Sequence, residues 1–137
     1  MKTREALTLD DVKKIAAAAE AEALKHHWPV TIAICDDGGH LLWLQRLDGA
    51  APVSSEVAPG KARAAAIGRK PSKAFEDMIN GGRFAALNMP VMPLEGGEMI
   101  VVNGTVIGAV GVSGVKAAED AQVARAGVAA IGAQVSL

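Results

Sequence analysis

A glycine-rich hairpin in the last third of the sequence is the feature that most constrains the fold. Apolar residues flank Asn103-Gly104 on both sides. This dipeptide is the strongest short-range signal for a β-hairpin, because both of its residues tolerate positive φ. Glycines recur along the second predicted strand and at its end, at Gly108, Gly111 and Gly114. Glycine weakens a strand, so it usually marks a bulge or a place where another group approaches the backbone.

The end of this hairpin is a candidate ligand-binding site. A helix is expected to begin at Ala117 and to run to about Val135. A glycine-rich strand that leads into a helix N-terminus can form the floor of a pocket, above all for an anionic ligand. The predicted ligand-binding residues here are Gly111, Ser113 and Gly114. The alternative, which the residues leave open, is a strand of small side chains packed under a helix.

The last predicted helix adds a candidate catalytic residue and a candidate interface. Glu119 lies in its first turn and is a natural general acid or base if the glycine turn opens into a pocket. The alternative is that this carboxylate only stabilises the helix dipole. The helix is apolar on several sides, which predicts that it is buried, in part by another subunit. We therefore expect a homo-oligomer.

Length and composition restrict the class of protein. A chain of 137 residues, half of them apolar, is expected to form one domain, 1–137, with its own core. A net charge of -1 and few aromatic residues argue against a nucleic-acid or membrane-surface partner. The single cysteine, Cys35, excludes an internal disulfide and a cysteine-cluster zinc site, and its apolar surroundings predict a buried thiol. The sequence has no signal-like or membrane-spanning run, so we expect a cytoplasmic location.

Periodicity and turn residues predict the other elements. The first helix should be capped by Thr8, with Asp11 three residues on, and should end near Lys25 because Pro29 prevents its continuation. A fifth short strand is expected between Phe84 and Met92. The remaining expected elements are strands at 30–35 and 40–47, helices at 52–69 and 72–79, and a loop at 83–97. Hairpin connections favour an α+β fold: an antiparallel sheet of about five strands, flanked by helices.

Several motifs carry a resemblance that covers the chain from about residue 7 to residue 131. They are Val30–Leu42, Gln45–Ala50, Gly60–Ala65, Val106–Gly114 and Glu119–Gly127. In this order and spacing they resemble the GlcG/HbpS family, which includes the C-terminal domain of PduO-type proteins. The resemblance implies a profilin-like antiparallel sheet and oligomers up to octamers. Some members bind haem and are linked to haem sensing or degradation, and others belong to catabolic gene clusters for small acids, diols or aromatic compounds.

The histidines are the candidate ligands of haem iron. His26 and His27 end the first helix, beside Trp28, whose flat apolar ring could border a porphyrin, and a neutral imidazole is a good iron or metal ligand. The alternative is that both residues cap the helix and stabilise its dipole. His40, next to Gly38-Gly39, is a third candidate ligand-binding residue, with a plain surface position as the alternative. The three histidines show no H-x-x-x-H or H-E-x-x-H spacing on one helix, so a preformed zinc site has only weak support.

A second set of charged residues surrounds the end of the strand at 40–47. An arginine can grip a carboxylate or a haem propionate in a bidentate manner, so Arg46 and the nearby Lys61 are candidate ligand-binding residues. Lys61 is also a candidate catalytic amine, which requires a lowered pKa. The alternative is a structural network in which Arg46, Asp48 and Lys61 join the strand to the helix.

These observations leave three functional hypotheses. The first is a haem- or small-ligand-binding protein of the GlcG/HbpS type, with haem as its cofactor. The second is a catabolic enzyme, a lyase or isomerase that acts on a small organic or aromatic acid. The third is an accessory structural oligomer without a ligand. The residues themselves do not decide between binding and catalysis.

Overall fold

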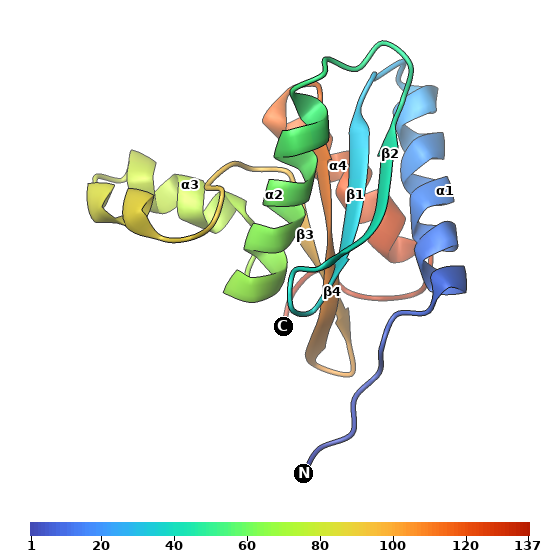
Figure 1. Ribbon diagram of the computed structural model, residues 1–137, viewed down its shortest axis with the longest axis horizontal. Helices are drawn as coiled ribbons and strands as arrows, with labels where there is room; N and C mark the ends of the chain where they lie inside the picture. Colours follow the sequence, from blue (N-terminus) through green and yellow to red (C-terminus); the bar gives the residue numbers. More distant parts are fainter.

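Four antiparallel strands form one sheet in the order β2-β1-β4-β3, with helices on both faces (Figure 1). The computed structural model describes residues 1–137. In chain order, the elements are α1 (Leu9–Lys25), β1 (Thr31–Asp36), β2 (Leu41–Arg46), α2 (Ser54–Gly68), α3 (Lys73–Asn80), the 3-10 helix η1 (Phe84–Asn88), β3 (Gly97–Val102), β4 (Thr105–Ser113) and α4 (Ala117–Ala129). The predicted α+β class is confirmed, but the sheet has four strands instead of five.

The two faces of the sheet are made by alternating residues. Along β1, Ile32 and Ile34 belong to the core shared with α1 and α4, whereas Ala33 and Cys35 belong to the core shared with α2. This alternation follows from the two-residue period of a strand. Large aliphatic side chains fill the α1/α4 side, and mostly alanines fill the α2 side. Small side chains therefore allow α2 to approach the sheet closely.

Helix α1 begins as the sequence predicts. The hydroxyl of Thr8 accepts a hydrogen bond from Asp11 N (3.2 Å), and the Asp11 carboxylate accepts one from Thr8 N (2.9 Å). This capping box satisfies amide groups that the first turn leaves unpaired. The helix ends at Lys25, after which His26 serves as the C-cap. None of the helices combines the length and the apolarity that a membrane crossing requires.

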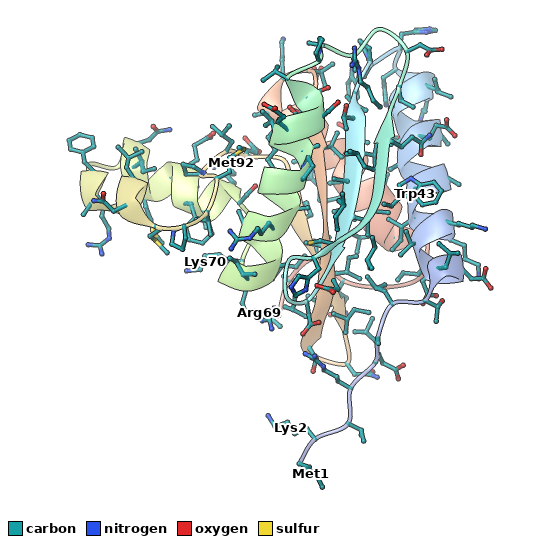
Figure 2. All side chains as sticks on the ribbon, in the orientation of Figure 1. Met1, Lys2, Trp43, Arg69, Lys70 and Met92 are labelled. Atoms are coloured by element: carbon teal, nitrogen blue, oxygen red, sulfur yellow. The ribbon has the colours of Figure 1, made fainter.

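Residues 70–94, here called the arm, project from the body beside α2 and contain α3 and η1 (Figure 1). Phe75 packs beside Gly68. Met92, labelled in Figure 2, contacts α2 at Gly60. The strand predicted between Phe84 and Met92 is wrong, because Phe84–Asn88 is a 3-10 helix. The arm leads the chain away from the sheet edge, so this segment has no neighbouring strand with which to pair.

Helix α4 ends at Ala129, earlier than the predicted end near Val135. Gly132 adopts a left-handed φ of 71°, and the chain then returns along the edge of the sheet. There Gln134 pairs with Val101 of β3 through backbone N···O distances of 2.8 and 2.9 Å. The buried side of α4 packs on α1 and on β3 and β4 of its own chain. The single chain therefore buries one side of α4, and the expected contribution of another subunit stays a prediction.

Candidate functional site

The end of α1 and the segment after β2 border an open cavity of about 480 Å³, here called the α1-end cavity. This volume lies within the range of small-ligand sites. Helix α1 supplies Glu20 and Leu24, and the segment after β2 supplies Leu47. The complete lining is Glu20, Leu24, His27, Trp28, Pro29, Leu47, Asp48 and Gly49. The cavity thus combines an apolar wall with one imidazole and two carboxylates.

The local backbone separates the two adjacent histidines. His26 is the C-cap of α1, with φ of -101° and ψ of 2°, whereas His27 has a left-handed φ of 57°. The turn is closed by Trp28 N, which donates to Ala23 O at 2.9 Å. Because of this reversal, His27 lines the α1-end cavity as an exposed residue, and His26 does not line it.

His26 instead supports the wall of the cavity. Its ring stacks on the indole of Trp28, with 4.3 Å between ring centroids. Its Nε2 lies 3.5 Å from Glu22 Oε2, and Gln122 of α4 donates to the same carboxylate at 2.9 Å. The hydrogen bond from Gln122 lowers the pKa of Glu22 against the opposing effect of partial burial. The stack and the hydrogen bonds together fix Trp28 in relation to α4.

Arg46 does not line the α1-end cavity. Its Nε donates to Ala50 O at 3.1 Å, which holds the turn that carries Leu47 and Asp48 into the lining. The predicted network of Arg46, Asp48 and Lys61 is not formed, because Lys61 pairs with another residue. Arg46 is exposed, but it is paired with Thr31, whose hydroxyl contacts Ser54 of α2. Its side chain therefore belongs to the α2 face of the sheet, away from the α1-end cavity.

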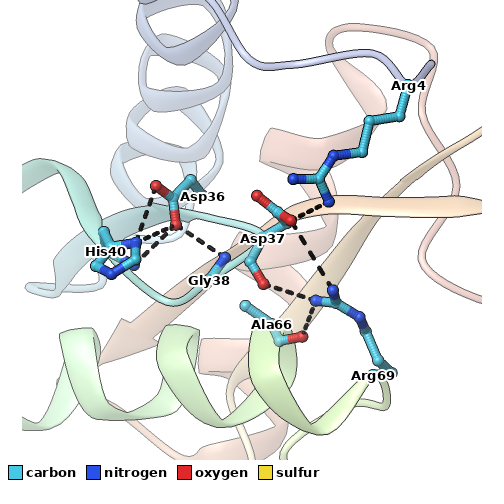
Figure 3. A network of polar contacts seen from close by, with 7 residues as sticks. All are labelled: Arg4, Asp36, Asp37, Gly38, His40, Ala66 and Arg69. Carbon is cyan, nitrogen blue, oxygen red and sulfur yellow. Dashed lines mark hydrogen bonds and ion pairs between the residues drawn. The ribbon is translucent and has the colours of Figure 1, made fainter. Parts of the chain in front are cut away.

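His40 lies at the turn of the β1–β2 hairpin (Figure 3). The α1-end cavity lies at the other end of this hairpin. Its side chain is 81% exposed, and its Nδ1 lies 3.1 Å from Asp36 Oδ1. Partial burial opposes ionisation of Asp36, but hydrogen bonds from His40 N and Gly38 N lower the pKa of this carboxyl overall. Arg4 and Arg69 contact Asp37 in the same turn. The structure therefore separates His40 from His26 and His27.

The pocket floor expected at the glycine-rich strand is filled. A Cβ at Gly111 would collide with backbone atoms of Ala58 and Ala62 in α2, and one at Gly114 would collide with Pro29 O. Ser113 pairs with Thr31 in the sheet and is 9% exposed. None of these three residues lines a cavity. At Gly111 the approaching group is helix α2, as in the alternative of small residues under a helix, and at Gly114 it is the Pro29 carbonyl.

Lys61 is enclosed and fully engaged in a second structural cluster. Its Nζ donates to Asp120 Oδ2 (3.1 Å) and to Val112 O (3.0 Å), and the two side chains are 5% and 3% exposed. Asp120 Oδ1 also accepts from Val115 N at 3.1 Å. Burial raises the pKa of Asp120, although Lys61 opposes this shift. Lys61 lines no cavity, so the structure does not place its amine where a substrate could reach it.

The remaining sequence candidates have structural partners. A Glu119 carboxylate oxygen accepts from Lys116 N at 3.3 Å, at the start of α4. Cys35 is buried as expected, and burial raises the pKa of its thiol to about 12, which keeps it protonated and unreactive. The residue that sequence reasoning missed is Asp120 as partner of Lys61. Both are charged residues within apolar segments. Because a buried charge needs a partner of opposite sign, this pattern could have indicated the pair.

The fold and the cavity define the class of protein: a small α+β domain with an open cavity at a helix end that contains an imidazole. Comparison with known proteins places it more closely. The chain belongs to the family described as "Haem degrading protein HbpS-like", whose model matches residues 7–129. The family expected from the sequence motifs is thereby confirmed.

Individual relatives agree over most of their length. Protein GlcG of Escherichia coli strain K12 is 48% identical over 114 residues, which cover 82% of this chain and 85% of GlcG. A crystal structure of a PduOC:haem complex has a TM-score of 0.88 and 29% identity, covering 97% of this chain and 100% of that chain. A crystal structure of HbpS has a TM-score of 0.87 and 31% identity, covering 96% and 94%.

Proposed function

We propose that this protein binds haem in the α1-end cavity and that His27 is the iron ligand. The observation that carries the proposal is an exposed imidazole on the rim of a cavity whose wall contains Trp28 and Leu47. Membership of the HbpS-like family and the similarity to a haem complex of PduOC support the same ligand. When bound, haem would supply an iron centre that accepts an axial ligand and exchanges electrons.

The composition of the cavity suits haem better than a bare metal ion. Structural metal sites in proteins need three or four ligands from side chains. The structure contains no group of three or more His, Cys, Asp or Glu residues that could hold a metal ion. Haem brings four equatorial nitrogen ligands of its own, so a single imidazole completes the attachment. An apolar wall is also the surface that a flat porphyrin needs.

His26 acts in this proposal as a positioning residue. It stacks on Trp28 and is held by Glu22 and Gln122, so it orients the indole that faces the cavity. In metal sites, loss of a residue that orients a binding side chain without contacting the metal typically lowers metal affinity ~10- to 100-fold. We therefore expect loss of His26 to weaken haem binding while leaving the iron coordinated.

The proposal is tested by titrating ferric haem into the purified protein and following the Soret band. Wild-type protein should shift the band and saturate at one haem per chain. His27→Ala should abolish the histidine-ligated spectrum and weaken binding at least ~10-fold, equivalent to ~1.4 kcal/mol. His26→Ala should keep the spectral type and weaken binding. His40→Ala is the matched control, because this exposed histidine lies at the other end of the hairpin.

Circular dichroism should show that all three variants retain the fold, since none of these histidines is buried. A wild-type spectrum identical to that of free haem would refute the proposed function. If His27→Ala keeps the wild-type spectrum and His40→Ala loses it, the iron ligand is His40, at the other end of the hairpin.

We also propose that the chain self-associates, and that the arm is the contact surface. The arm exposes four large apolar side chains: Phe84, Leu87, Met89 and Leu94. Soluble monomers rarely expose large contiguous apolar patches, and the arm projects from the body where a second copy can reach it (Figure 1).

The cytoplasmic location remains a prediction. The enzyme hypothesis loses one of its supports, because Lys61, one of the residues on which it relied, is buried and lines no cavity.

A further inference from the structure

The formally charged side chains that line the α1-end cavity all have the same sign. Two of its lining residues are carboxylates, Glu20 and Asp48, and none is a lysine or an arginine. Neither carboxylate takes part in an ion pair. His27 is the only lining residue that can become cationic, and the proposed function uses its imidazole for the iron. An anionic group bound in the cavity therefore finds no fixed positive partner among the lining residues.

The position of one carboxylate is set by neighbouring residues. Gln45 Nε2 donates to Glu20 Oε1 at 3.0 Å, and Gln45 Oε1 accepts from Trp43 Nε1 at 3.1 Å. This chain of hydrogen bonds holds the Glu20 carboxylate on the wall. Asp48 is exposed on the other side of the cavity. A bound molecule would thus lie between one fixed and one solvent-exposed negative charge.

Haem has two chemically different edges. One edge carries two propionates, which are anionic at neutral pH, and the opposite edge is apolar. Placing the propionates near Glu20 and Asp48 would bring like charges together without a compensating cation, and this repulsion is unfavourable. The apolar edge has no such cost against Leu24, Trp28 and Leu47.

We infer that the α1-end cavity takes the apolar edge of the porphyrin inward and leaves the propionates in solvent, so that Glu20 and Asp48 determine the orientation. This inference rests on the proposed function, because it concerns haem in that cavity. It implies that recognition depends on the ring and the iron, and that the propionates contribute repulsion instead of affinity. The ligand class is therefore an iron tetrapyrrole, with little requirement for acidic side groups.

The test compares ferric haem with its dimethyl ester, in which both propionates are uncharged. We expect the ester to bind at least as tightly as haem. Because salt screens repulsion between charges, the ratio of haem affinity to ester affinity should rise as the salt concentration increases. Using the ratio removes the general effect of salt on apolar association, which both ligands share.

Three variants separate the carboxylates from general surface charge. Glu20→Gln and Asp48→Asn should each raise haem affinity ~2- to 3-fold at low salt, as expected for charges near a solvated surface. They should leave the affinity for the ester unchanged. Glu56→Gln is the matched control, since Glu56 is exposed on α2, which packs on the other face of the sheet. This control should change neither affinity.

The outcomes distinguish the orientation from the proposed function. If haem binds through His27 but at least tenfold more tightly than the ester, with a ratio that falls as salt rises, the propionates are held by cations and the orientation is overturned. In that result haem binding itself stands. If neither porphyrin gives a histidine-ligated Soret band with wild-type protein, the proposed function fails as well.

Discussion

At the scale of single residues, a change in one backbone angle separates two adjacent histidines. Both belong to the end of α1, but the left-handed φ of 57° at His27 turns the chain. A non-glycine residue with positive φ is uncommon and is usually held by its surroundings. Here the hydrogen bond from Trp28 N to Ala23 O and the following Pro29 fix the turn. The same turn brings Trp28 against His26 and leaves His27 at the cavity.

The second residue-scale feature is the missing side chain at Gly111, and it gives a stability prediction. Gly111→Ala should lower the free energy of unfolding by ~2 kcal/mol or more, because the added methyl meets backbone atoms of α2 that cannot move independently. Chemical denaturation monitored by circular dichroism measures this change.

Gly60→Ala is the matched control for Gly111→Ala. Its added methyl would lie 2.8 Å from Met92 Cε, the end of a flexible side chain that can shift. Alanine also favours a helix over glycine by ~1 kcal/mol, so the net change should stay within ~1 kcal/mol. Equal stability of the Gly111→Ala variant and wild type would show that α2 does not lie on the strand as described.

At the scale of elements, the Lys61–Asp120 pair joins three of them. Lys61 belongs to α2, its acceptor Val112 to β4, and Asp120 to α4. The two helices lie on opposite faces of the sheet, so the pair connects both layers around the end of β4. A buried pair of this kind contributes less to net stability than its removal costs, since desolvation offsets much of the attraction.

A double-mutant cycle tests this connection. Lys61→Met and Asp120→Asn should each lower the free energy of unfolding by ~3–5 kcal/mol, because each leaves a buried polar group without its partner. The double variant should lose markedly less than the sum of the two. The surface pair Lys73–Asp77, with side chains 51% and 57% exposed, is the control. Its cycle should show a coupling of ~0.5 kcal/mol or less.

The Lys61→Met variant should also acquire a characteristic pH dependence. Burial raises the pKa of Asp120 in the folded protein, and removal of Lys61 takes away an opposing effect. The folded state then binds this proton more tightly than the unfolded chain, so stability falls as pH rises through the folded pKa. The variant should be closer to wild type near pH 5 than at pH 7. A pH-independent difference between variant and wild type would contradict the assignment.

Local sequence signals predicted the elements well and their contacts poorly. The cap of α1 and the Asn103-Gly104 turn depend on residues close in sequence, and both were correct. The Lys61–Asp120 pair joins residues 59 positions apart, and only the packing of α2 on the sheet brings them together. The same packing fills the space above Gly111. The strand predicted after Phe84 failed because pairing requires a neighbour, which the sequence pattern does not reveal.

At the scale of the whole molecule, the apolar surface is distributed unevenly. Composition indicated that another subunit buries part of α4, and the chain itself buries one side of this helix. The arm instead carries Phe84 and Leu87, which are 69% and 63% exposed. The Val101–Gln134 bridge covers part of the β3 edge of the sheet, which reduces edge-to-edge association there. These features together make the arm the favoured surface for a second copy.

The arm leads to the final prediction, which concerns assembly. Phe84→Asp combined with Leu87→Asp should convert the proposed oligomer to a monomer in light scattering, because contact would then bury two carboxylates without partners. The fold should persist, with stability within ~0.5 kcal/mol per site, since both side chains are exposed in the isolated chain. Asn88→Asp is the control, because it adds a charge to the same exposed segment without removing an apolar side chain. Wild-type protein that stays monomeric at high concentration, or a double variant that keeps the wild-type mass, would exclude the arm as the interface.

Haem binding by the monomeric double variant tests a further point. Loss of binding would show that the α1-end cavity depends on the assembly, whereas retained binding would show that a single chain forms the complete site.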